Sequence, residues 1–179
     1  SDSPSLIEQK SKNFVSLGLA IKNNSKSLAT ESKIIMLLIA PYFFKDLSNI
    51  KTIEEQGYLL KHLKLSNTNH KILKSLVDEE QNLGGFLLLS AEEKLDCLYR
   101  FDFYRRPNII FEVLNILSVF RTTFHHVDLK HFKDIKIFLD LFSEEIRQLK
   151  SEVDLSNSGE DIKKLIYQER LSLLIKITN

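Results

Sequence analysis

The sequence predicts an all-α protein, with about seven to eight helices packed around one central apolar helix at residues 109–120 and no significant sheet. Apolar residues recur at helical spacing along most of the chain, and no stretch alternates convincingly between apolar and polar residues. Only three prolines and five glycines occur in 179 residues, which disfavours a turn-rich β fold. The content of 43% hydrophobic and 27% charged residues is typical of a globular chain that buries a core.

The sequence predicts two helices in the N-terminal part of the chain. The first runs from Leu6 to Ile21, with its apolar residues on one face. Thr30 or Ser32 is a candidate N-cap of the second, whose apolar stretch 34–39 runs into Pro41. Because proline lacks a backbone N–H and crowds the preceding turn, we expect a kink or a stop there.

Two further helices are predicted before residue 90. Ser48 is a candidate cap of a helix with apolar residues at helical spacing over 50–63. The polar linker 65–69 then starts a helix through 72–83, and Gly84-Gly85 ends it. We therefore expect residues 1–89 to form an N-terminal helical part, which continues into residues 90–179 as one helical unit.

The central helix follows a strong pair of boundary signals. Ser90 and Glu93 form a capping box that opens a helix over 91–104. Pro107 suits the first turn of the next helix and pushes the preceding residue out of helical geometry, so the earlier helix should stop near Tyr104. In the helix 109–120 the polar residues fall on one narrow stripe, which predicts burial around most of its circumference. With the preceding Asn108, they are Glu112, Asn115 and Ser118.

Two long helices complete the prediction. After a polar break at 121–127, apolar residues from Phe132 to Leu149 repeat at spacings of three and four, which indicates one buried side. A second break at 156–161 precedes the last helix, which Ser158 and Asp161 are expected to cap.

The composition excludes several classes of function. The net charge of +1 provides no global attraction to a polyanion, so neither DNA nor a membrane is predicted as a partner and any RNA contact has to be local. Cys97 is the only cysteine, which fits a reducing, cytoplasmic location and excludes an internal disulfide; we expect it to be buried. The longest apolar run, 34–44, is far shorter than the ~20 residues that span a bilayer.

One cluster has metal-ligand residue types. His125, His126, Asp128 and His131 lie in and just after a predicted loop, and no second cluster completes a coordination sphere. We therefore interpret them as a solvated helix start and predict no metal site. The chain also shows no phosphate-binding glycine loop and no nucleophile elbow, so no catalytic residue is predicted.

Basic and aromatic residues gather before Pro107. Arg100, Arg105 and Arg106 alternate with four aromatic residues, and arginine binds phosphate while aromatic rings stack on bases. The alternative is that the rings pack in the core and the arginines neutralise Asp96 and Asp102; the residues alone favour this packing interpretation. A second basic set near the C-terminus consists of Lys163, Lys164 and Arg170.

Three stretches resemble the bacterial tRNA nucleotidyltransferases (CCA-adding enzymes) and related poly(A) polymerases. They occur in the family's order: LKHLKLSNTNHKILKSLV (60–77), LYRFDFYRRPNIIFEVLNI (98–116) and SGEDIKKLIYQERLSLL (158–174). In the last, the resemblance matches a pattern of a glycine, an acidic residue, an isoleucine and a later arginine. Those positions are Gly159, Glu160, Ile162 and Arg170.

This resemblance implies a helical body and tail that carry the acceptor arm of tRNA. Catalysis in the family resides in an N-terminal head that uses Mg²⁺ with ATP or CTP; this sequence lacks the head's glycine-rich motif and paired aspartates. We therefore expect a C-terminal fragment or a stand-alone relative without a catalytic centre, which binds RNA through Arg105, Arg106 and the tail lysines. The His-Asp hydrolase site of some relatives is replaced by Leu38-Ile39-Ala40-Pro41.

Two alternatives remain open. The first is a helical protein-interaction module without an RNA role, which the neutral charge and the helical hairpins favour. The second is a degenerate His-Asp hydrolase fold, which would require a bound metal near Tyr42 or Asp46.

Overall fold

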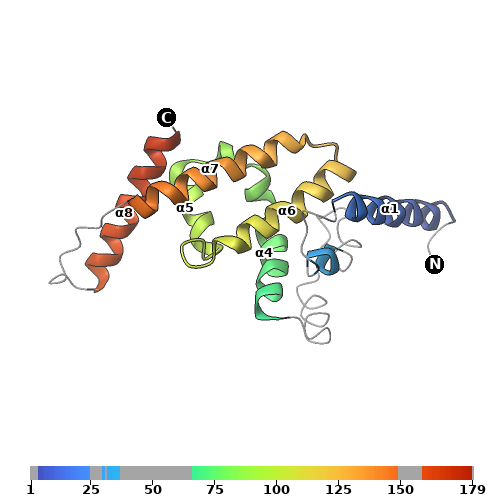
Figure 1. Ribbon diagram of the computed structural model, residues 1–179, viewed down its shortest axis with the longest axis horizontal. Coiled ribbons are helices and arrows are strands. Elements are labelled where there is room, and N and C mark those ends of the chain that lie inside the picture. The colour runs from blue at the N-terminus through green and yellow to red at the C-terminus, as the bar shows by residue number, and fades with distance from the viewer. Residues whose placement is uncertain (1–3, 25–29, 31, 37–65, 149–158, 179) are drawn as a thin grey trace. The chain divides into compact units, whose positions relative to one another are not determined.

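The computed structural model describes residues 4–24, 30, 32–36, 66–148 and 159–178. Every regular element in these ranges is helical, so the predicted all-α class is confirmed (Figure 1). None of the described helices is long and apolar enough to cross a membrane. The elements are α1 (Pro4–Asn23), α4 (Asn67–Gly84), the 3₁₀ helix η2 (Phe86–Leu88), α5 (Ala91–Arg100), α6 (Pro107–Phe124), α7 (Leu129–Gln148) and α8 (Gly159–Thr178).

The chain forms two compact units that interleave along the sequence. The first unit combines residues 1–80 with 108–129, and the second combines 81–107 with 130–179. Each unit therefore joins segments that are distant in the sequence.

The first unit contains the apolar helix α6. It begins at Pro107, as predicted, and its apolar residues between Ile109 and Phe120 are buried around most of the helix. We predicted a polar break over 121–127, but the helix continues to Phe124, so the predicted start of this break at Arg121 is wrong. Thr122 donates a hydrogen bond to the Ser118 carbonyl, which shows how a polar side chain is accommodated in the last helical turns.

The polar stripe of α6 has a buried partner within the same unit. The Ser32 hydroxyl, only 1% exposed, donates to Glu112 Oε2 at 2.6 Å. A carboxylate on an otherwise apolar helix thereby has a hydrogen-bond donor, which offsets the cost of its partial burial. Buried apolar residues of the same unit include Leu17, Ile35, Met36, Ile72, Leu73 and Leu76.

The second unit contains a separate, aromatic core. Phe86 packs edge-on against Phe138 with ring centroids 5.8 Å apart, and Phe103 stacks on Phe142 at 6.3 Å. The predicted buried side of α7 is confirmed, because Phe132, Ile135, Leu139 and Phe142 are each at most 2% exposed. From α8, Leu173 and Leu174 are buried.

Helix α5 begins as predicted and ends earlier than predicted. The Ser90 hydroxyl accepts from the Glu93 N–H at 3.2 Å, and Glu93 Oε2 accepts from the Ser90 N–H at 2.8 Å, which confirms the capping box. The helix ends at Arg100 and not near Tyr104. Asp102 takes φ +56°, in the left-handed region that ends a helix and that aspartate enters more readily than most residues.

Some predicted features lie outside the described residues. These are the helix over 50–63, the end of the second helix at Pro41, and the Ser158 cap of α8. The described part of the second helix, 32–36, is helical, and Gly85 follows the end of α4 with its N–H donating to the Gln81 carbonyl at 3.1 Å.

We expect Ser90→Ala to lower the free energy of unfolding by about 1 kcal/mol, because the Glu93 N–H in the first turn of α5 loses the hydroxyl that accepts its hydrogen bond. Urea unfolding followed by circular dichroism measures the change. Ser172→Ala, at an exposed position inside α8, is the matched control and should cause no such loss. Equal stability of the Ser90 variant and the wild type would show that the box does not stabilise the protein.

Candidate nucleic-acid interface

The segment between α5 and α6 forms a tight turn, residues 102–106, that we call the Asp102 corner. The Phe103 N–H donates to the Leu98 carbonyl at 3.0 Å and the Asp102 N–H to the Tyr99 carbonyl at 2.9 Å. This pair of bonds is the Schellman pattern, which satisfies the last carbonyls of a helix. The Asp102 carbonyl in turn accepts from the Arg105 N–H at 3.1 Å and the Arg106 N–H at 2.8 Å. The backbone of both arginines is therefore held by one residue.

The same aspartate pairs with both arginine side chains. Arg105 Nε and Nη2 donate to the two carboxylate oxygens of Asp102 at 2.8 and 3.0 Å, and Arg106 Nε lies 3.8 Å from Oδ2. Hydrogen bonding to this carboxylate raises the pKa of Arg105. The arginine side chains nevertheless remain 75% and 48% exposed. Two cations against one carboxylate leave the corner with a net positive charge.

Arg170 occupies a different environment from the corner arginines. Its guanidinium carbon lies 3.5 Å from the ring centroid of Tyr104 and 5.6 Å from that of Tyr99, and Nη1 donates to the Tyr99 hydroxyl at 3.0 Å. A guanidinium over a tyrosine ring is attracted by the electron-rich face of that ring. Arg170, which we predict as an RNA-binding residue from the sequence, thus anchors α8 on α5.

Tyrosine rings extend this anchor. Tyr99 and Tyr167 stack with centroids 6.0 Å apart and planes 7° from parallel, and Tyr104 packs against Tyr99 at 5.1 Å. Tyr104 also contacts Phe142 of α7 at 6.4 Å. The aromatic residues of the predicted basic cluster therefore pack between helices, as the packing interpretation predicts, although 39% of Tyr99 stays exposed.

The Tyr104 hydroxyl is buried and has no hydrogen-bond partner among the described residues. Burial raises the pKa of this phenol above its usual value of 10.0, and the nearby Arg170 opposes the shift. An unpaired buried hydroxyl destabilises the folded state.

The remaining predicted basic residues are exposed. Arg100 lies in the last turn of α5, and Lys163 and Lys164 lie in the first half of α8. Because α8 packs against α5, the structure brings both predicted basic sets into the second unit. Among the six predicted residues, the side chains of Arg105 and Arg106 share a carboxylate, and Arg170 contacts tyrosines.

Two other residues that the sequence singled out, His131 and Cys97, also have a structural role in the fold. His131 Nε2 lies 2.7 Å from the Gly84 carbonyl, at the C-terminus of α4, and Cys97 is buried as predicted. In the described part of the chain, no group of three or more His, Cys, Asp or Glu side chains comes together as metal ligands do.

Sequence reasoning missed Lys94, which is 1% exposed. Its ammonium donates to the Leu89 carbonyl at 2.5 Å and lies 5.8 Å from the Phe138 centroid, and burial lowers its pKa. The available signal was its spacing of four residues from Leu98, which places both on one helical face.

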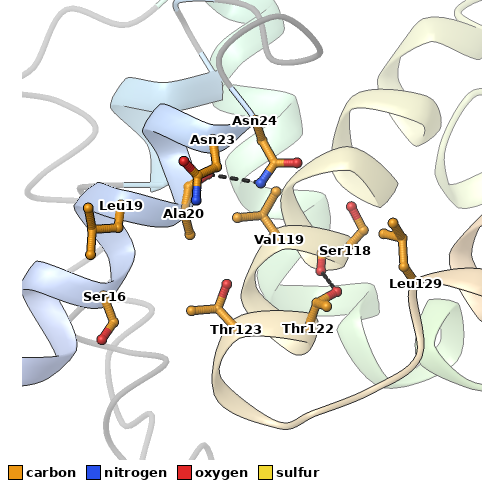
Figure 2. A pocket seen from close by; sticks show the side chains of 10 residues that line it. All are labelled: Ser16, Leu19, Ala20, Asn23, Asn24, Ser118, Val119, Thr122, Thr123 and Leu129. Atoms are coloured by element: carbon orange, nitrogen blue, oxygen red, sulfur yellow. Dashed lines mark hydrogen bonds between the residues drawn. The ribbon is translucent and has the colours of Figure 1, made fainter.

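A pocket of about 430 Å³ lies in the first unit between α1 and α6 (Figure 2). No charged residue lines the pocket, so none of the six predicted basic residues contributes to it. Its surface therefore suits a neutral hydrogen-bonding group and offers no cation for a phosphate. The polar lining residues are Ser16, Asn23, Asn24, Ser118, Thr122 and Thr123.

No protein-family model, curated protein or solved structure matches this chain. The geometry of the Asp102 corner and the residues that carry the family resemblance are therefore the observations that bear on function.

We expect the two tyrosines beside Arg170 to respond oppositely to loss of the hydroxyl. Tyr104→Phe should leave the free energy of unfolding unchanged or raise it by up to about 1 kcal/mol, because it removes an unpaired buried group. Tyr99→Phe should lower it by about 0.5–1.5 kcal/mol, because Arg170 loses an acceptor. Urea titrations of the two variants make the comparison.

The pH dependence provides a second readout. The unfolded chain ionises Tyr104 at a lower pH than the folded chain, so this phenol destabilises the protein as the pH rises above 10.0. Wild type should therefore lose stability more steeply than Tyr104→Phe in that range. Parallel curves for the two proteins would contradict the burial of this hydroxyl.

Proposed function

We propose that this chain binds RNA through the Asp102 corner, as the helical body and tail of a protein of the tRNA nucleotidyltransferase or poly(A) polymerase type. The observation that supports the proposal is an exposed arginine pair whose backbone and side chains are both oriented by Asp102. An arginine that is already ordered loses less conformational entropy when it binds a ligand.

The chemistry of the corner suits a phosphate. The Arg105 guanidinium has five N–H donors, of which Asp102 accepts two, so donors remain for a second anion. Such contacts hold an RNA backbone in position without reading its sequence. Lys163 and Lys164 would add charge from α8, while Arg170 holds that helix against α5.

We expect the double variant Arg105→Glu, Arg106→Glu to bind tRNA more weakly and with a shallower salt dependence. Two lost phosphate contacts should reduce the slope of log Kd against log salt by about 1.5. Fluorescence anisotropy with labelled tRNA at several salt concentrations measures both quantities. Arg147→Glu is the matched control, because Arg147 is also 75% exposed and also pairs with a carboxylate three residues away, Glu144, at 3.2 Å.

Circular dichroism and salt dependence separate the possible outcomes. Unchanged tRNA affinity in a folded double variant would contradict the proposal. Loss of helicity in the double variant would show that the arginine pair is structural. An RNA affinity that is independent of salt in the wild type would favour the helical protein-interaction module, because phosphate contacts release counterions.

Asp102→Asn tests the same corner in the opposite direction. Asparagine also accepts the left-handed backbone region, so the turn should persist while the negative charge is removed. We expect tRNA affinity to rise by roughly twofold to tenfold, because both arginines then face the phosphate without a competing carboxylate. Weaker binding by a folded Asp102→Asn variant would show that orientation of the arginines matters more than their net charge.

A further inference from the structure

Helix α7 exposes two large apolar side chains on the side opposite its buried face. Ile137 is 57% exposed and Leu141 is 55% exposed, whereas Ile135 and Leu139 are fully buried. Residues four apart lie one above the other on a helix, so Ile137 and Leu141 form a continuous apolar strip near the middle of α7.

Charge on this exposed face is polarised along the helix. The half before Ile137 carries a net charge of +2, and the half after it, to Gln148, carries a net charge of −2. Lys130, Lys133 and Lys136 outnumber Asp134 in the first half. Asp140, Glu144 and Glu145 outnumber Arg147 in the second half.

We propose that this face of α7 binds the same face of a second copy of the chain, with the two helices antiparallel. A two-fold axis at the level of Leu139 places Ile137 of one copy opposite Leu141 of the other. At a rise of 1.5 Å per residue, Lys133 and Glu145 both lie about 9 Å from that axis, so they fall level with each other. The basic half of each helix then faces the acidic half of the other, whereas a parallel pair would align like charges.

The strength of the association follows from the size of the face. Stable protein interfaces bury roughly 1,200–2,000 Å² in total, and one helix pair with two central apolar residues per copy lies at or below that range. Asp134 falls near Glu144 of the second copy and opposes association. We therefore expect a reversible dimer with a dissociation constant on the order of tens of micromolar. No residue of the Asp102 corner takes part, so this proposal is independent of RNA binding.

Sedimentation equilibrium over a concentration series tests the apolar strip. The wild-type chain should convert from monomer to dimer with concentration, and Leu141→Asp should weaken the dimer at least about tenfold. The milder pair Ile137→Ala, Leu141→Ala should weaken it in the same direction, and circular dichroism should show that both variants remain folded.

The charge polarity has a sharper test. Lys133→Glu and Glu145→Lys should each weaken the dimer about tenfold. In a homodimer of either variant, residues 133 and 145 carry the same charge, so both cross-chain pairs become repulsive. An equimolar mixture of these two variants should dimerise as tightly as wild type or more tightly, since both cross-chain pairs become opposite in sign. Lys74→Glu, an exposed lysine on α4, is the control and should leave the dissociation constant unchanged.

Three results would overturn the proposal. The first is a wild-type chain that remains monomeric at about 0.5 mM, well above the expected dissociation constant. The second is a dimer that Leu141→Asp does not weaken. The third is a mixture of the charge variants that associates no better than either variant alone.

Discussion

Asp102 is the residue on which the arrangement of the candidate interface depends. Its left-handed backbone ends α5, its carbonyl accepts from two following N–H groups, and its carboxylate pairs with both corner arginines. Phe101 and Phe103, each 2% exposed, bury the chain on either side of it. A residue in an uncommon backbone region persists when its surroundings hold it there. Here the hydrogen bonds and the two buried rings do so, and the arginines are displayed outside the core as a result.

Arginines of this unit divide into two roles according to their contacts. Arg105 is 75% exposed and pairs with one exposed carboxylate, which contributes little to folding. Arg170 lies 3.5 Å from the Tyr104 ring and donates to Tyr99, so its charge is satisfied by packing between helices. The same residue type is therefore an exposed surface group in one position and a helix anchor in the other. The anchor supports the interface, because it sets the position of α8 on α5.

The second unit thus has two surfaces of different chemistry. The Asp102 corner is cationic and polar, whereas the exposed strip of α7 is apolar at its centre and charged with opposite signs at its ends. Solvent competes for the arginines of the corner, so the proposed interaction with RNA phosphates would depend on salt. In the proposed dimer, the α7 strip would gain from removal of apolar area from water, and its charges would mainly select the orientation of the second copy. A two-fold dimer would present two corners to one nucleic acid or to two.

The sequence by itself determined the features that depend on residues within about one helical turn of each other. Helical periodicity predicted the all-α class and the buried side of α7, the spacing of Ser90 and Glu93 predicted the capping box, and Pro107 predicted the start of α6. Only the tertiary structure decided the early end of α5, the anchoring of Arg170 on tyrosines 66 and 71 residues away, and the burial of Lys94. Those outcomes depend on which distant side chains pack together, and local spacing does not determine that choice. For Lys94, the spacing of four residues from Leu98 indicated only that both lie on one helical face. For the same reason the sequence located the basic cluster, whereas the fold separated its exposed arginines from its structural one.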